Sequence, residues 1–338
     1  MFVFLLMKLT MQKNIKDERK IFRLIAINST IIYVFSFLFV FFVYQFITAF
    51  IASQYHIRLI FYYDQLKFLT PDNSPFWYSD SAVTIFASGP LFSAFMAFIF
   101  IMLYQKFSNN ESLIKLFFLW GALHFINRII GSFIIGTIFF LYGSNLIADW
   151  LYLGMEMKIL LVAIAIIVLV VIGSYSINAI LASANSFTLL KTNNRGVFIK
   201  NQIFIPWLAG SIILLILYLP KIPLHETLIN VTMLIMLLPI YFKFDSVMFP
   251  EVEDQMPTYR FSWRFLAFLI IFLIAFRIIF GKGIPFGSEA ENEAGMLEIF
   301  IIVAIILLGL LYQLIKSIKQ KRKKLEKMMD ENFNPDLY

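Results

Sequence analysis

A polar stripe interrupts an apolar stretch of this sequence, Trp120 to Gly136, which reads WGALHFINRIIGSFIIG. His124, Asn127 and Arg128 are spaced i, i+3 and i+4, so they share one face of a helix. An imidazole transfers protons or binds metal, and a guanidinium binds carboxylate or phosphate groups. Ionisable groups inside a membrane span are costly, so this stripe indicates a functional site whose partners lie elsewhere in the chain.

The composition is that of a membrane protein. Of the 338 residues, 60% are hydrophobic and 14% are charged, and the mean hydropathy is +0.82. The absence of cysteine excludes disulfides, a thiolate nucleophile and thiolate-bound zinc. The net charge of +7 comes from basic residues that flank apolar runs. We therefore expect the partner to be a lipid bilayer and not nucleic acid.

Apolar runs of about 18 residues or more predict membrane-spanning helices. The sequence has eight such runs, so we predict an all-α polytopic membrane protein. The predicted spans are 24–52, 83–104, 113–141, 158–181, 203–219, 227–242, 265–280 and 297–315.

The charges predict how these spans are oriented. Basic residues gather in 1–23, after the fourth span and in 316–338, which places both termini in the cytoplasm. The acidic loop from Gly287 to Glu298 is then outside. We expect a protein of a bacterial-type cytoplasmic membrane, anchored by its basic tail.

The connection at 53–82 differs from the other loops. It mixes β-forming residues with the turn sequence TPDNSP and with the interfacial aromatics Trp77 and Tyr78. This pattern predicts a short β element at the membrane interface. The membrane region then divides into a three-helix part at 24–141 and five further helices at 142–315.

Arg128 needs a counter-ion that its own span does not supply. No Asp or Glu occurs between Ser112 and Ala148. The remaining candidates are Asp149 or Glu156 from the next segment, backbone carbonyls of a broken helix, or a bound carboxylate or lipid phosphate. Alternatively, the stripe only joins helices through hydrogen bonds to carbonyls and hydroxyls.

Two further motifs precede the stripe. Tyr44, Gln45 and Thr48 occupy i, i+1 and i+4 in the first span, and the second span opens with SGPLFSAF. In that motif Gly89 allows a close helix contact, and Pro90 suits the first turn of a helix.

Together, residues 40–140 resemble the three-helix core of the site-2 family of intramembrane metalloproteases. That core has a first helix with H-E-x-x-H-A, a membrane-associated β element, a second helix that begins with Gly-Pro, and a third helix with an N-P-D-G-like motif. The positions corresponding to H-E-x-x-H are Tyr44, Gln45 and Thr48 here, and the third helix has no acid. The zinc ligands are therefore missing, so we predict no catalytic residues, no metal and no cofactor.

Three functions remain as hypotheses. The first is a non-catalytic relative of the site-2 proteases that binds a membrane client or partner helix in a pocket formed by Tyr44, Gln45, Thr48, Gly89, Pro90, His124, Asn127 and Arg128. The second is a transporter or anion carrier that uses Arg128 and His124. The third is an enzyme, either a metalloprotease with a metal site relocated to His56, His124 and Asp64 or Asp149, or a lipid-modifying enzyme with His124 as base.

Overall fold

The computed structural model describes the part of the chain that precedes Ser288. Its described residues are 2–106, 112–140, 144–184, 186–245 and 261–287. The predicted eighth span at 297–315, most of the acidic loop and the tail at 316–338 lie outside these residues.

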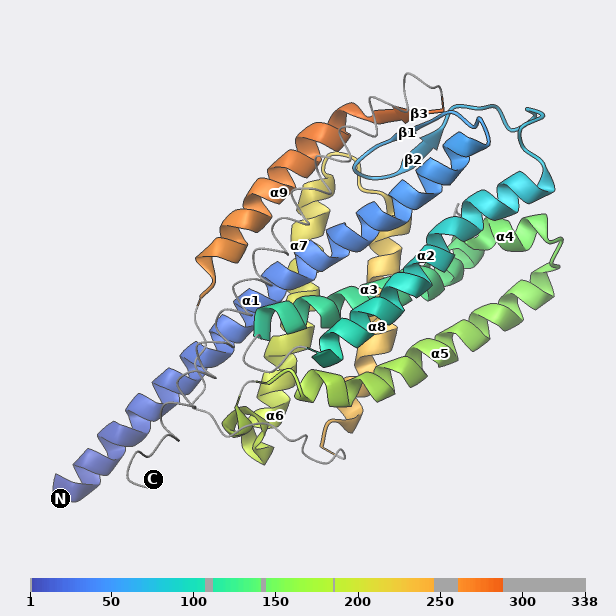
Figure 1. Ribbon diagram of the computed structural model, residues 1–338. Helices are drawn as coiled ribbons and strands as arrows, with labels where there is room; N and C mark the ends of the chain where they lie inside the picture. The colour runs from blue at the N-terminus through green and yellow to red at the C-terminus, as the bar shows by residue number, and fades with distance from the viewer. Residues whose placement is uncertain (1, 107–111, 141–143, 185, 246–260, 288–338) are drawn as a thin grey trace, which may run out of the picture. The chain divides into compact units, whose positions relative to one another are not determined.

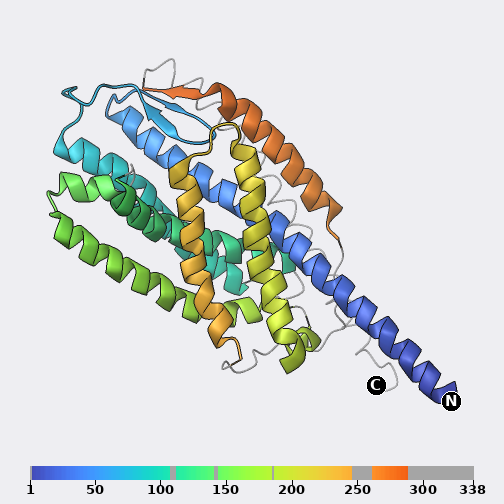
Figure 2. The same cartoon turned by 180° about the vertical axis from the view of Figure 1, so that it is seen from behind.

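Helices dominate the described chain (Figures 1 and 2). They are α1 (Phe2–Gln54), α2 (Ser79–Lys106), α3 (Ser112–Phe139), α4 (Ser144–Trp150), α5 (Met155–Leu181), α6 (Thr192–Ile199), α7 (Ile205–Tyr218), α8 (Leu224–Lys243) and α9 (Trp263–Lys282). A 3₁₀ turn at Phe187–Leu190 precedes α6, and a π-helical turn at Lys200–Phe204 joins α6 to α7.

Within the described residues, seven helical stretches are long and apolar enough to cross a bilayer. They correspond to the first seven predicted spans. The chain is therefore an integral, all-α polytopic membrane protein, as predicted. Helices suit this setting because they satisfy their own backbone hydrogen bonds, which lipid cannot do.

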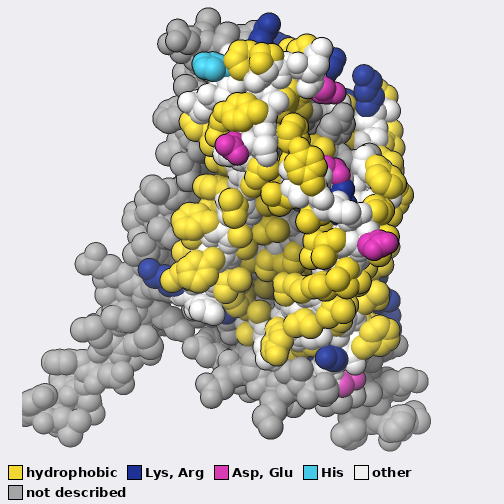
Figure 3. Space-filling model, turned by 90° about the vertical axis from the view of Figure 1, so that its right-hand side faces the viewer, with side chains coloured by type: hydrophobic (Ala, Val, Ile, Leu, Met, Phe, Trp, Pro, Cys, Tyr) yellow, Lys and Arg dark blue, Asp and Glu magenta, His cyan; other side chains and the backbone are white. Residues whose placement is uncertain are grey.

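The surface agrees with a bilayer environment. In the face shown in Figure 3, hydrophobic side chains dominate the middle, and most charged side chains lie toward the two ends. Large apolar residues are exposed on the spans, for example Phe95 on α2 and Ile271 on α9, which are 57% and 65% exposed. Such exposure would be unfavourable in water but is ordinary against lipid tails.

The first three helices pack against one another. Glycine makes their close contacts possible: a Cβ on Gly121 of α3 would lie 2.3 Å from the ring of Phe100 on α2. A Cβ on Gly89 of α2 would lie 2.8 Å from Oγ1 of Thr48 on α1. The backbone of α2 therefore lies directly against the polar turn of α1.

The remaining spans join this group through similar contacts. A Cβ on Gly173 of α5 would lie 1.9 Å from the carbonyl oxygen of Met236 on α8. A Cβ on Gly210 of α7 would lie 2.2 Å from the ring of Tyr33 on α1. Small residues thus set the helix spacing, as is usual where lipid removes the hydrophobic drive for helix association.

The β element predicted after the first span is part of a three-stranded antiparallel sheet, which lies near the ends of α1 and α9 in both ribbon views (Figures 1 and 2). Its order is β2-β1-β3, and its strands are β1 (Leu59–Phe61), β2 (Leu66–Phe68) and β3 (Ile284–Phe286). Ile60 pairs with Lys67 on one side and with Pro285 on the other. The third strand was not predicted, because three residues after a span carry no strand pattern of their own.

Two features of the helices bear on the predicted site. The short helix α4 forms in a segment read as a connection. α2 begins at Ser79, where the hydroxyl of Ser81 accepts a hydrogen bond from the backbone N–H of Tyr78 at 3.0 Å. Pro90 therefore lies inside α2 and not in its first turn. Because proline lacks an N–H, the carbonyl of Phe86 loses its usual helical partner there.

Candidate functional site

A cavity of about 600 Å³ lies among the second half of α1, strand β2 and the first turn of α8, with α2, α3 and α4 completing its wall. Its lining mixes aromatic, polar and charged side chains. The lining residues are Tyr44, Gln45, Thr48, Asp64, Gln65, Leu66, Lys67, Phe68, Asp72, Trp77, Phe86, Arg128, Leu146, Trp150, Pro223, Leu224, His225 and Glu226.

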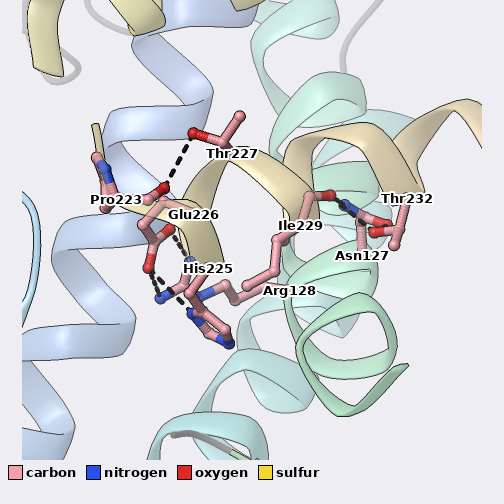
Figure 4. Close-up of polar contacts among 8 residues, drawn as sticks. All are labelled: Asn127, Arg128, Pro223, His225, Glu226, Thr227, Ile229 and Thr232. Atoms are coloured by element: carbon pink, nitrogen blue, oxygen red, sulfur yellow. Dashed lines mark hydrogen bonds and ion pairs between the residues drawn. The ribbon is translucent and has the colours of Figure 1, made fainter. Parts of the chain in front are cut away.

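Arg128 of α3 and Glu226 of α8 form a bidentate ion pair at this cavity (Figure 4). Nη2 of Arg128 donates to Oε1 of Glu226 at 2.8 Å, and Nη1 donates to Oε2. The two side chains are 3% and 2% exposed. A buried charge pair persists only where both groups are well hydrogen-bonded, which the fork geometry provides.

The first turn of α8 brings a second ionisable group to the same carboxylate. Nδ1 of His225 lies 3.7 Å from Oε1 of Glu226, and the ring lines the cavity. Figure 4 shows the carboxylate of Glu226 facing both the guanidinium of Arg128 and this ring. The carboxylate is therefore the centre of the charged cluster.

The polar turn of α1 lies against this cluster. The guanidinium of Arg128 is centred 4.4 Å from the ring centroid of Tyr44, a cation–π contact. The hydroxyl of Thr48 donates to the carbonyl of Tyr44 at 3.0 Å. Gly89 fits between these two side chains, since its missing Cβ would clash with both.

Gln45 is the least satisfied polar residue of that turn. Its side chain lines the cavity and is 8% exposed. Among the described residues, no hydrogen-bond partner contacts its amide. Its donors and acceptor are therefore available to an occupant of the cavity or to water.

Asn127 holds α3 to α8 beside the ion pair. Its Nδ2 donates to the carbonyl of Ile229 at 2.7 Å, and its Oδ1 accepts a hydrogen bond from Thr232 at 2.9 Å (Figure 4). Asn127 does not line the cavity. It serves to lock the two helices at the level of the ion pair.

His124 lies outside the cavity, contrary to its place in the predicted pocket. Its ring packs against Tyr33 and Trp120, with centroids 4.7 Å and 5.8 Å away. The side chain is 4% exposed. One helical turn separates it from Arg128, which is enough to place it in the aromatic core between α1 and α3.

The two acids proposed to neutralise Arg128 are placed elsewhere. Asp149 of α4 pairs with Lys158 of α5 and accepts a hydrogen bond from Asn145 at 2.9 Å. Glu156 is exposed. Both candidates were wrong: Asp149 is in the last turn of α4, paired with Lys158, and Glu156 is in the first turn of α5.

Glu226 was not identified from the sequence as the partner of Arg128. A signal was available: Glu226 and Asn230 are one turn apart and share a face with the apolar Met233 and Leu237, all of them buried. Polar residues on the apolar, inward face of a span indicate buried partners. For Asn230 that partner is the hydroxyl of Tyr33.

The side chains proposed for a relocated metal site do not meet. His56 lies at the end of α1 with its ring 6.0 Å from that of Phe76, while His124 is in the core. Asp149 is engaged with Lys158. Among the described residues, no three His, Asp or Glu side chains are grouped as metal ligands would be.

Asp64 adds a carboxyl outside the spans, in the turn between β1 and β2. It lines the cavity and is 8% exposed. Burial raises the pKa of this carboxyl above its ordinary value. A hydrogen bond to its own backbone and the positive charges of Lys221 and Arg277 only partly oppose that rise.

No protein-family model, curated protein or solved structure matches this chain. Fold and site alone define its class. It is an integral membrane protein with a cavity of mixed apolar and polar lining beside a small sheet, and a buried ion pair forms part of the cavity wall.

Proposed function

We propose that the protein is a non-catalytic, site-2-protease-like membrane protein that holds a segment of a membrane client or partner helix in this cavity. One observation carries the proposal: Tyr44, Gln45 and Thr48 meet Arg128 around a single cavity. These positions correspond to the first and third helices of the site-2-protease core. Their side chains can hydrogen-bond a client but cannot assemble the family's zinc site.

The unpaired edge of strand β2 suggests that the client segment is extended. The N–H of Tyr62 donates to the carbonyl of Gln65, and the N–H of Leu69 donates to the carbonyl of Arg58. Because pairing alternates along an antiparallel strand, the backbone groups of Leu66 and Phe68 point away from β1. The residues of β2 line the cavity, and a client strand that pairs with this outer edge would extend the sheet beside it.

The other hypotheses receive less support. A carrier would use the charge of Arg128 to bind an anion, but Glu226 already neutralises that charge. A lipid-modifying enzyme with His124 as base would need that ring in the cavity, and the ring packs in the core instead.

Site-specific photocrosslinking in living cells tests the proposal. A benzophenone amino acid at Lys67, which is exposed and lines the cavity, should crosslink to one recurring stretch of a membrane protein. The same probe at Phe95, exposed on α2 outside the cavity lining, is the control and should not.

A proline test addresses the pairing with β2. Leu66→Pro removes an N–H that points away from β1, on the free edge of the strand, and should reduce the crosslink several-fold. Leu66→Ala keeps the N–H and should retain the crosslink. Equal crosslinking from both probe positions, or crosslinks to lipid alone, would refute client binding.

A further inference from the structure

Gln45 combines burial with an unused hydrogen-bonding group. It lies in the spanning part of α1, is 8% exposed and lines the cavity. No other described residue hydrogen-bonds its amide. Its amide is not among the fully enclosed polar groups that lack a partner in the described part of the chain, so it is open to the cavity.

The neighbouring groups do not supply the missing partner. The hydroxyl of Thr48 is directed to the carbonyl of Tyr44, and the two Nη atoms of Arg128 bind the carboxylate of Glu226. The buried Nε of Arg128 has no hydrogen-bond partner among the described residues, so it does not bind Gln45 either. The amide of Gln45 therefore faces the cavity with two N–H donors and one carbonyl acceptor. Another amide matches this combination, because it accepts and donates in the same plane.

We propose that Gln45 determines specificity by pairing with an amide group of the client, supplied either by a peptide group in an unwound stretch or by an Asn or Gln side chain. The inference rests on the proposed client-binding function. A continuous helix in lipid has satisfied all its interior peptide groups internally. Gln45 thus selects clients whose spans are broken or carry an amide side chain.

Three synthetic 20-residue peptides test this selection. The first is a continuous Leu/Ala helix, the second has a central Gly-Pro break, and the third has one central Asn. Each carries a fluorescent acceptor and is reconstituted in liposomes with full-length protein. The protein carries a donor dye at Lys67→Cys, which is feasible because the chain has no native cysteine. Energy transfer at the cavity rim then reports binding.

We expect the broken peptide, the Asn peptide or both to bind about tenfold more tightly than the continuous helix, about the effect of one well-made hydrogen bond. The peptide that shows the preference identifies which amide source the site uses. Gln45→Leu should abolish the preference. Gln54→Leu is the matched control, since Gln54 is exposed at the end of the same helix, outside the cavity lining, and should keep it.

The outcomes separate this inference from the proposed function. If all three peptides bind equally, or if Gln45→Leu keeps the preference, Gln45 is hydrated by water and does not select clients, while client binding stands. If no peptide binds but Lys67 still crosslinks to a client in cells, an amide is not sufficient for recognition and the inference fails. If crosslinking also fails, the proposed function fails with it.

Discussion

Arg128 and Glu226 are 98 positions apart in the chain, yet their side chains form a two-point ion pair between α3 and α8. Both are almost fully buried. The pair therefore joins the third span to the first turn of α8, far along the chain. Nδ1 of His225 lies 3.7 Å from the same carboxylate.

Replacing one residue of this pair should destabilise the protein more than replacing both. Arg128→Met or Glu226→Met alone leaves an uncompensated buried charge, which costs about 3–5 kcal/mol. The double variant leaves no charge and should recover most of the stability. Thermal unfolding in detergent, followed by tryptophan fluorescence, measures this. Single effects that simply add in the double variant would contradict the coupling.

The contact between α5 and α8 depends on a missing side chain. Gly173→Ala should destabilise the protein by about 1–3 kcal/mol, because the new methyl group would overlap the carbonyl of Met236. Gly281→Ala on α9 is the matched control, since nothing lies within 4 Å of its added Cβ. The midpoint of thermal unfolding should fall for the first variant only. Equal midpoints would mean that the helices separate at no cost.

The buried carboxyl of Asp64 should make stability depend on pH. Its pKa is raised in the folded state from the ordinary value of 3.8, so the folded protein binds the proton more tightly than the unfolded chain does. The stability that the folded state gains from this proton is fully present below pH 3.8 and is lost as the pH rises through the raised pKa. Asp64→Asn should therefore melt higher than the wild type at pH 7.

The difference in melting temperature between Asp64→Asn and the wild type should shrink as the pH falls below the ordinary pKa of 3.8, where the wild-type carboxyl is also neutral. A melting series across this range in detergent provides the measurement. An advantage that is the same at every pH would show that charge on Asp64 is not its cause.

The orientation predicted from the basic residues can be tested with single cysteines. Asn73→Cys and Tyr152→Cys should react with a membrane-impermeant maleimide in intact cells, since both positions are exposed in connections placed outside. Lys191→Cys should react only after permeabilisation. Labelling of Lys191→Cys in intact cells would reverse the topology.

Purified protein should contain no stoichiometric zinc. The positions that resemble the metal-binding motif are Tyr44, Gln45 and Thr48, which cannot form that zinc site. Elemental analysis provides the measurement. About one zinc per chain, lost in His225→Ala, would contradict the prediction and reopen the question of catalysis.

The sequence by itself determined the membrane class and the approximate positions of the first seven spans. It did so because length and hydropathy are local properties, and lipid requires each span to satisfy its own backbone. The short β element was also readable, from its composition and flanking aromatics. The polar residues Tyr44, Gln45, Thr48 and Arg128 were identified as unusual for the same local reason.

Only the tertiary structure decided which of these residues meet. The partner of Arg128 is in the first turn of a distant helix, and the strand β3 pairs with β1 from the other end of the described chain. His124 lies one turn from Arg128 and yet belongs to the core. Spacing along one helix fixes a shared face, but crossing angles and glycine contacts between helices decide which part of that face meets a cavity and which meets an aromatic ring.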